Sequence, residues 1–175
     1  MLNMIYSTFK KIKCVVLDVD GVLTNGTILV NEEGHQLRAF NVKDGYAIQY
    51  AVRQGLLVFV ITGGRSQGVL SRFEGLHVPE IHLGVSDKLT LLKELLVRYG
   101  LSLGEVAFIG DDMPDYTCMK AVGAAISPAD AVEDIKKVSH YVSTKSGGEG
   151  VVRETIEKIL RLQDKWHSEV LIKSV

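Results

Sequence analysis

The chain has 175 residues, of which 46% are hydrophobic and 23% charged, and its formal net charge at pH 7 is −1. This length predicts one domain over residues 1–175, with a core that needs no disulfide or structural metal. The composition excludes a disordered chain, and the charge balance gives no sign of a nucleic-acid-binding surface. The longest apolar run, residues 56–61, is too short to span a bilayer, and the first residues do not resemble a signal peptide. Cys14 and Cys118 stand alone, so we expect reduced, buried thiols in a cytoplasmic protein.

Short β-like runs alternate with helical runs along the whole chain. In chain order we expect strand 13–19, helix 44–54, strand 56–62, helix 66–74, strand 80–83, helix 86–100 capped by Ser86, strand 104–110, a helix starting near Pro114, strand 124–127, helix 129–137, strand 140–143 and helix 151–166. This alternation predicts an α/β fold with a parallel sheet between two layers of helices. Ligands of such sheets bind at the carboxyl ends of the strands.

One segment interrupts the alternation. Residues 26–40 predict two strands around a turn from Asn31 to Gly34, which is a β-hairpin inserted after the first strand. An isolated hairpin is marginally stable in water, so we expect it to pack on another part of the assembly, such as a second subunit. The apolar side chains that we expect two subunits to share are Ile28, Val30, Leu37 and Phe40.

Residues suited to phosphate chemistry follow the ends of four expected strands. They are Asp18 and Asp20, then Thr62, Gly63, Gly64 and Arg65, then Lys88, and finally Asp111, Asp112 and Asp115. In a parallel sheet these four loops meet at one edge. Carboxylates so close together cannot all ionise unless a cation balances them, and oxygen ligands favour Mg²⁺. The sequence therefore predicts a magnesium site that works with a substrate phosphate.

The spacing also suggests a role for each side chain. Asp18 is suited to attack phosphorus, and Lys88 would offset its negative charge. Asp20 would protonate the leaving oxygen and then activate water against the aspartyl phosphate. Thr62 would donate a hydroxyl hydrogen bond, and the backbone of residues 63–64 is free to approach a phosphoryl oxygen.

The last acidic cluster predicts the rest of the metal site. Asp111 is the expected second metal carboxylate after Asp18. Asp112 and Asp115 are expected to hold water on the metal or to orient Lys88. Each motif alone is equally typical of a plain turn or helix cap, whereas the complete set in this order favours an enzyme. A receiver-like module that holds a phosphoaspartate and a scaffold without activity remain as alternatives.

At these residues the chain resembles the haloacid-dehalogenase-like (HAD) phosphohydrolase superfamily. The matching motifs are DVDGVLT at 18–24, ITGG at 61–64, Lys88 and GDDMPD at 110–115. Two further segments, FNVKDGYAI at 40–48 and GGEGVVRE at 147–154, resemble the 3-deoxy-D-manno-octulosonate 8-phosphate (KDO 8-phosphate) phosphatase family. The likeness extends over roughly residues 13–166.

The resemblance implies a capless, Rossmann-like, Mg²⁺-dependent phosphatase of lipopolysaccharide precursor synthesis. It implies a homotetramer whose hairpins meet at the centre, with neighbouring subunits covering the active sites. By this likeness Asp18 is nucleophile and metal ligand, Asp20 is acid and base with its backbone carbonyl on the metal, and Asp111 is a metal ligand. The implied substrate contacts are Asp20, Asn41, Val42, Lys43, Asp44, Gly45, Gly63, Gly64, Arg65, Arg72 and Lys88.

The chain departs from the family pattern at two positions. The family commonly reads TGR, whereas here the arginine is displaced by one place to Arg65, and Gln49 stands where the family often has a basic residue. A phosphatase of a related nine-carbon sugar acid shares the core motifs, so that substrate is an alternative. Residues 146–150 are either a tail that closes over the site, with Lys145 and Arg153 beside it, or an ordinary loop before the last helix.

Overall fold

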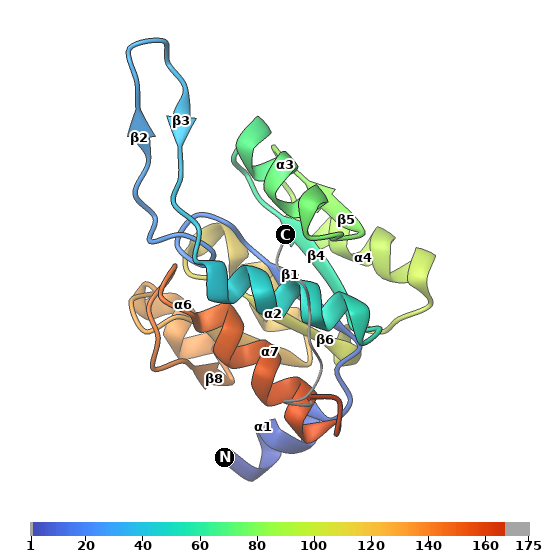
Figure 1. Ribbon diagram of the computed structural model, residues 1–175. Helices are drawn as coiled ribbons and strands as arrows, with labels where there is room; N and C mark the ends of the chain where they lie inside the picture. Colours follow the sequence, from blue (N-terminus) through green and yellow to red (C-terminus); the bar gives the residue numbers. More distant parts are fainter. Residues whose placement is uncertain (1, 167–175) are drawn as a thin grey trace.

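The computed structural model of the protein describes residues 2–166. Its centre is a six-stranded parallel sheet in the order β5-β4-β1-β6-β7-β8 (Figure 1). The strands are β1 (Cys14–Leu17), β4 (Leu57–Ile61), β5 (Glu80–His82), β6 (Val106–Ile109), β7 (Ala124–Ser127) and β8 (Tyr141–Val142). The helices are α1 (Leu2–Phe9), α2 (Val42–Arg53), α3 (Gln67–Gly75), α4 (Lys88–Tyr99), α5 (Tyr116–Ala121), α6 (Glu133–Val138) and α7 (Val151–Leu162), with short 3-10 helices η1 (Leu103–Glu105) and η2 (Met113–Asp115).

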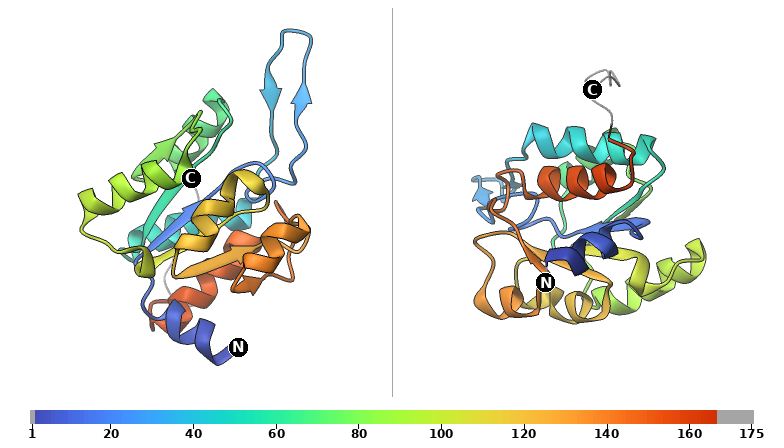
Figure 2. Two further views of the ribbon diagram at one scale, coloured as in Figure 1. Left: turned by 180° about the vertical axis from the view of Figure 1, so that it is seen from behind. Right: turned by 90° about the horizontal axis from the view of Figure 1, so that it is seen from below.

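Helices cover both faces of the sheet, which confirms the predicted α/β architecture. Successive side chains of a strand point to opposite faces, so Val15 and Leu17 of β1 pack with α1, α2, α3 and α7. Cys14 and Val16 face the other way and pack with α4, α5 and α6. Figure 2 shows α2 and α7 side by side over one face. Cys14 and Cys118 are both buried, unpaired thiols.

The predicted hairpin is present and projects away from the body of the molecule (Figures 1 and 2). It consists of β2 (Leu29–Val30) and β3 (Gln36–Leu37), paired antiparallel. Leu29, Val30 and Leu37 are 68%, 64% and 55% exposed. Phe40, at the base, packs instead on the core of its own chain, with its ring 5.6 Å from that of Phe73. The hairpin itself therefore presents apolar side chains to its surroundings.

Several boundaries differ from the sequence-based expectation. Asp87, not Ser86, caps α4, because its side chain accepts a hydrogen bond from the Thr90 amide at 3.0 Å. The expected helix 129–137 begins only at Glu133, because Val132 is extended, with ψ at 150°, and its amide donates to the Asp111 carbonyl and not to the Pro128 carbonyl as a helix would require. The expected helix 151–166 ends at Leu162, and the chain then turns through Asp164, whose φ is 55°.

Helix α1 was not expected from the sequence. Ile5 and Phe9, one helical turn apart, are both buried in the core shared with α7. This tertiary burial stabilises a short segment that has no acidic residue in its first turn and no basic residue in its last turn. Between residues 2 and 166, no helix has both the length and the apolar content needed to cross a membrane.

Candidate active site

Strand register brings the predicted site residues to one edge of the sheet. Leu17 of β1 lies level with Val60 of β4 and with Ile109 of β6. Asp18, Thr62 and Asp111 therefore follow within two residues of one common level. This edge lies at the carboxyl end of β1, which has β4 on one side and β6 on the other. The connections that follow β1 and its neighbours leave toward opposite sides there, and open α/β sheets bind ligands at such a point.

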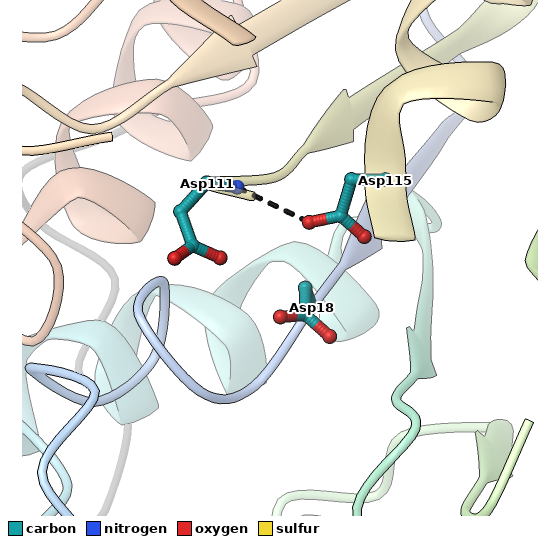
Figure 3. A group of neighbouring side chains, drawn as sticks. All are labelled: Asp18, Asp111 and Asp115. Carbon is teal, nitrogen blue, oxygen red and sulfur yellow. Dashed lines mark hydrogen bonds between the residues drawn. The ribbon is translucent and has the colours of Figure 1, made fainter. Parts of the chain in front are cut away.

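Three carboxylates meet at this edge (Figure 3). Asp18, Asp111 and Asp115 each offer one oxygen, and these oxygens lie within 4.8 Å of one another. Asp115 is buried in η2, and its Oδ2 accepts a hydrogen bond from the Asp111 amide at 3.1 Å. The GDDMPD segment therefore folds so that its last aspartate fixes the backbone of its first.

Lys88, the first residue of α4, inserts its ammonium between two of these carboxylates. Its Nζ donates to Asp18 Oδ1 at 2.6 Å and to Asp115 Oδ1 at 2.7 Å, and the whole residue is only 5% exposed. Burial alone would lower the pKa of Lys88, but the charges of Asp18 and Asp115 raise it. The lysine is therefore held as a cation.

One ammonium does not balance three clustered carboxylates, of which Asp18 and Asp115 are buried and Asp111 is partly buried. Burial and the charge of Asp115 raise the pKa of Asp18 to about 7, against the opposing effect of Lys88. Burial, Asp18 and Asp115 raise the pKa of Asp111 to about 8. Negative charge is thus unfavourable at this edge unless a further cation joins it.

Gly21 lets the loop after β1 approach this cluster. Its φ is +92°, and a Cβ atom there would overlap the Asp111 carboxylate. Residues other than glycine rarely adopt this φ, and a side chain there would have no room beside Asp111. An Asp-Gly pair after a strand is equally typical of a plain turn, so the sequence alone does not indicate this close approach.

Asp20 lies apart from the three-carboxylate cluster and has its own cation. Its side chain is 29% exposed, and both its oxygens accept hydrogen bonds from the guanidinium of Arg38, at 2.7 and 3.0 Å. Arg38 directly follows β3 of the hairpin. It was not among the predicted site residues, because an arginine in a hairpin gives no signal in the sequence that it turns inward.

The turn after β4 lies beside Asp20. The hydroxyl of buried Thr62 accepts a hydrogen bond from the Gly64 amide at 3.2 Å. A Cβ atom on Gly64 would lie 3.3 Å from Asp20 Oδ2. Arg65 folds onto the chain at Gly84, where a Cβ atom would overlap its guanidinium.

The segment 41–45 contacts the segment 147–154, two stretches far apart in the chain. Asn41 caps α2 through the Lys43 amide and donates from Nδ2 to the Gly148 carbonyl at 3.0 Å. Asp44 is 1% exposed, and its Oδ1 accepts a hydrogen bond from the Arg153 amide at 2.6 Å.

The remaining residues of the predicted substrate set lie around α2 and α3. Val42 is 75% exposed and Lys43 is exposed, whereas Gln49 is buried. A Cβ atom on Gly45 would overlap the Arg72 guanidinium, so α3 places Arg72 directly over α2 there.

Residues 146–150 form a loop packed against the active-site loop. The Gly148 amide donates to the Val22 carbonyl at 3.0 Å, and the Gly147 amide donates to Asp130 Oδ1 at 2.9 Å. The Arg153 guanidinium lies over the rings of Tyr46 and Trp166, at 5.3 and 4.6 Å from their centroids. Asp112 is exposed and accepts a hydrogen bond from the Met113 amide at 2.7 Å.

Comparison with known proteins identifies relatives over nearly the full chain. The family of haloacid dehalogenase-like hydrolases matches residues 78–154. The 3-deoxy-D-manno-octulosonate 8-phosphate phosphatase of Yersinia pestis is 39% identical over 154 residues, which cover 88% of this chain and 82% of that protein. The enzyme of the same name from Escherichia coli K12 is 36% identical, covering 89% and 83%.

Solved structures of phosphatases with this name resemble the chain as well. The phosphatase from Moraxella catarrhalis, in complex with a magnesium ion, a phosphate ion and KDO, is 40% identical and superposes with a TM-score of 0.91 over 94% of each chain. The Yersinia pestis phosphatase superposes with a TM-score of 0.91 at 37% identity, over 93% of this chain and 88% of the other. With its acidic cluster, its parallel sheet and these relatives, the chain belongs to the 3-deoxy-D-manno-octulosonate 8-phosphate phosphatase family of HAD-like hydrolases.

Proposed function

We propose that this protein is a cytoplasmic, Mg²⁺-dependent phosphatase that hydrolyses KDO 8-phosphate to KDO and inorganic phosphate for lipopolysaccharide precursor synthesis. The observation that carries the proposal is the cluster of Asp18, Asp111 and Asp115 around Lys88. Its occurrence in a chain 39% identical to a phosphatase named for this substrate supports the eight-carbon sugar acid over a nine-carbon one.

The donor set at the sheet edge suits magnesium. All its ligands would be oxygens, and the three carboxylates carry more negative charge than Lys88 offsets. We assign Asp18, Asp111 and the backbone carbonyl of Asp20 as the protein ligands. The bound ion would supply positive charge that lets an anionic phosphate approach an anionic carboxylate.

The chain's own residues perform the two half-reactions. An oxygen of Asp18 attacks phosphorus while the bond from phosphorus to the sugar oxygen breaks, and Asp20 gives its proton to that oxygen. Asp20 then takes a proton from a water molecule, which attacks the aspartyl phosphate and breaks its bond to Asp18. Phosphate leaves, and Asp18 is regenerated.

Neighbouring groups hold the phosphate and the nucleophile. Lys88 fixes the orientation of Asp18, and Asp115 fixes Lys88 through its own ion pair. The Thr62 hydroxyl, which accepts from the Gly64 amide, and the Gly63 amide would donate hydrogen bonds to the phosphoryl oxygens, and Gly64 lies beside Asp20 at the same edge. Asp112 would hold water at the metal.

A cationic groove offers a place for the sugar acid. It has a volume of about 840 Å³ and lies between the hairpin and α3. Three arginines line it, Arg38, Arg65 and Arg72. We assign Arg65 and Arg72 to the substrate carboxylate, because arginine pairs with carboxylates in a bidentate manner. Lys43, exposed at the start of α2, is assigned to the same carboxylate as a further positive charge. Asn41, Val42, Asp44 and Gly45 would support that end of the site.

We also propose a homotetramer in which hairpins of different subunits pack together. The support is the exposure of Ile28, Leu29, Val30 and Leu37 on a hairpin that projects from the body. Sedimentation of the intact protein tests this proposal, and a monomer at assay concentrations would contradict it.

Phosphate release with Mg²⁺ tests the activity. The substrates are KDO 8-phosphate, a nine-carbon sugar-acid 9-phosphate and a neutral hexose phosphate. We expect the highest kcat/KM with KDO 8-phosphate, no release after chelation, and none from Asp18→Asn, while the surface variant Asp134→Asn keeps full activity. Faster turnover of the nine-carbon ester would overturn the substrate assignment. A long-lived phosphoprotein without turnover would favour a receiver-like module, and no release from any ester would favour a scaffold.

A further inference from the structure

The hairpin delivers an arginine into the active site of its own chain. Arg38 follows β3, and its side chain is only 3% exposed, although the preceding Leu37 is 55% exposed. Its Nε donates to Asp20 Oδ1 at 2.7 Å, and its Nη2 donates to Asp20 Oδ2 at 3.0 Å. A third donor, Nη1, reaches the Gln36 carbonyl at 3.4 Å. The guanidinium thus ties the hairpin backbone to the Asp20 carboxylate.

This pairing fixes an orientation as well as a charge. Two parallel hydrogen bonds from one planar guanidinium hold both oxygens of a carboxylate, so the carboxylate cannot rotate without breaking one of them. The other buried cation of the site, Lys88, donates its hydrogen bonds to Asp18 and Asp115 and not to Asp20. Among the residues that the structure describes, Arg38 is the one whose side chain bonds the Asp20 carboxylate.

The pair is fitted to the turn that follows β4. A Cβ atom on Gly64 would lie 3.3 Å from Arg38 Nη2 and 3.3 Å from Asp20 Oδ2. The ion pair therefore lies directly against the backbone that we assign to the phosphoryl oxygens. Small displacements of a proton-transfer group at such a position are costly, because transfer requires hydrogen-bond distance to the reacting oxygen.

We propose that Arg38 is a positioning residue that orients Asp20 for proton transfer to and from the substrate. The inference rests on the proposed function, in which Asp20 is the acid and base. It gives the hairpin a role in the chemistry of its own subunit in addition to assembly. A positioning role predicts a loss in kcat with little change in KM, since Asp20 acts in the chemical steps rather than in binding the sugar.

The test compares Arg38→Gln and Arg38→Lys with Arg98→Gln. Arg98 is 64% exposed, pairs with Glu80 and lies at the end of α4 opposite Lys88. We expect Arg38→Gln to lower kcat for KDO 8-phosphate about 100-fold, within the range that acid–base catalysis contributes. Arg38→Lys keeps the charge but loses the bidentate contact, so its kcat should lie between those of Arg38→Gln and the unmodified protein. Millimolar guanidinium should restore part of the activity of Arg38→Gln. Arg98→Gln should behave as the unmodified protein.

A second substrate separates positioning from a structural role. 4-Nitrophenyl phosphate has a leaving group that needs no proton, so its first turnover should remain within about threefold in Arg38→Gln while steady-state turnover falls. An equal loss in the first turnover would show a structural role and overturn the inference. A raised KM with unchanged kcat would make Arg38 a substrate ligand, and unchanged kinetics would also refute positioning.

The unmodified protein keeps the two proposals distinguishable. If it hydrolyses 4-nitrophenyl phosphate but not KDO 8-phosphate, the substrate assignment fails and the first-turnover comparison still decides the role of Arg38. Circular dichroism of each variant confirms that the fold is intact. If Arg38→Gln does not fold, Arg38→Lys decides: an unaltered kcat in Arg38→Lys would overturn the inference.

Discussion

Asp44 makes the stability of this protein depend on pH, and Asp44→Asn should remove that dependence. Asp44 is 1% exposed, and although its Oδ1 is hydrogen-bonded to the Arg153 amide, its buried Oδ2 has no partner among the described residues. Burial raises the pKa of Asp44 from 3.8 to about 6, against the hydrogen bond from Arg153. The folded protein therefore binds this proton more tightly than the unfolded chain does.

The sign and the size follow from these two pKa values. A raised folded-state pKa contributes stability that is present in full below about pH 4 and is lost as the pH rises through about 6. At about 1.4 kcal/mol per pH unit, the interval from 3.8 to about 6 corresponds to about 3 kcal/mol in the free energy of unfolding. About 2 kcal/mol of this should appear between about pH 4.5 and pH 7.

Urea unfolding of metal-free protein at several pH values measures the effect. The quantity to compare is the difference in unfolding free energy between the unmodified protein and Asp44→Asn, since other carboxylates titrate equally in both. The exposed aspartate variant Asp134→Asn is the control and should give a constant difference. If the Asp44→Asn difference is also constant with pH, the burial argument is wrong.

Three further predictions concern the cluster of Asp18, Asp111 and Asp115 with Lys88, and the loop beside it. Lys88→Met leaves two buried carboxylates without their ammonium, so it should abolish activity and lower the unfolding free energy by about 3–5 kcal/mol without Mg²⁺; equal urea midpoints would contradict this. Mg²⁺ should raise the thermal midpoint of the unmodified protein but not of Asp111→Asn, and an equal rise in both would remove Asp111 from the ligand set. A Cβ atom on Gly147 would overlap the Gly21 carbonyl, so Gly147→Ala should lower the unfolding free energy by about 1–3 kcal/mol and lower kcat. The control is Gly75→Ala, which has open space around the new methyl group and should change neither quantity. If Gly147→Ala unfolds as the unmodified protein does, the packing argument is wrong.

Local patterns were sufficient for the sheet and for most helices. The runs 13–19, 56–62 and 104–110 are apolar and β-branched, and they form β1, β4 and β6 because such residues fit a strand buried on both faces. Gly100 ends α4 in the left-handed conformation, as the sequence indicates. Helix α1 and the end of α7 were not predictable, because burial against distant elements, rather than local signals, sets them.

The site divides in the same way. Asp18, Thr62, Lys88 and Asp111 were predictable as a group, because parallel strands present their carboxyl ends at one edge. The inward turn of Arg38 onto Asp20 was not, since a hairpin residue can face solvent or the body with the same sequence pattern. Nor was the burial of Asp44, which depends on the approach of α7 to α2.

The sequence by itself therefore determined the class of fold and the chemical equipment, because periodicity and residue type act over a few neighbouring positions. Only the tertiary structure decided which side chains share a charge. Lys88 lies 70 positions from Asp18 and 27 from Asp115, and Arg38 lies 18 positions from Asp20. Hydrogen bonds act over about 3 Å, so pairings across such separations exist only once the sheet and its helices have packed.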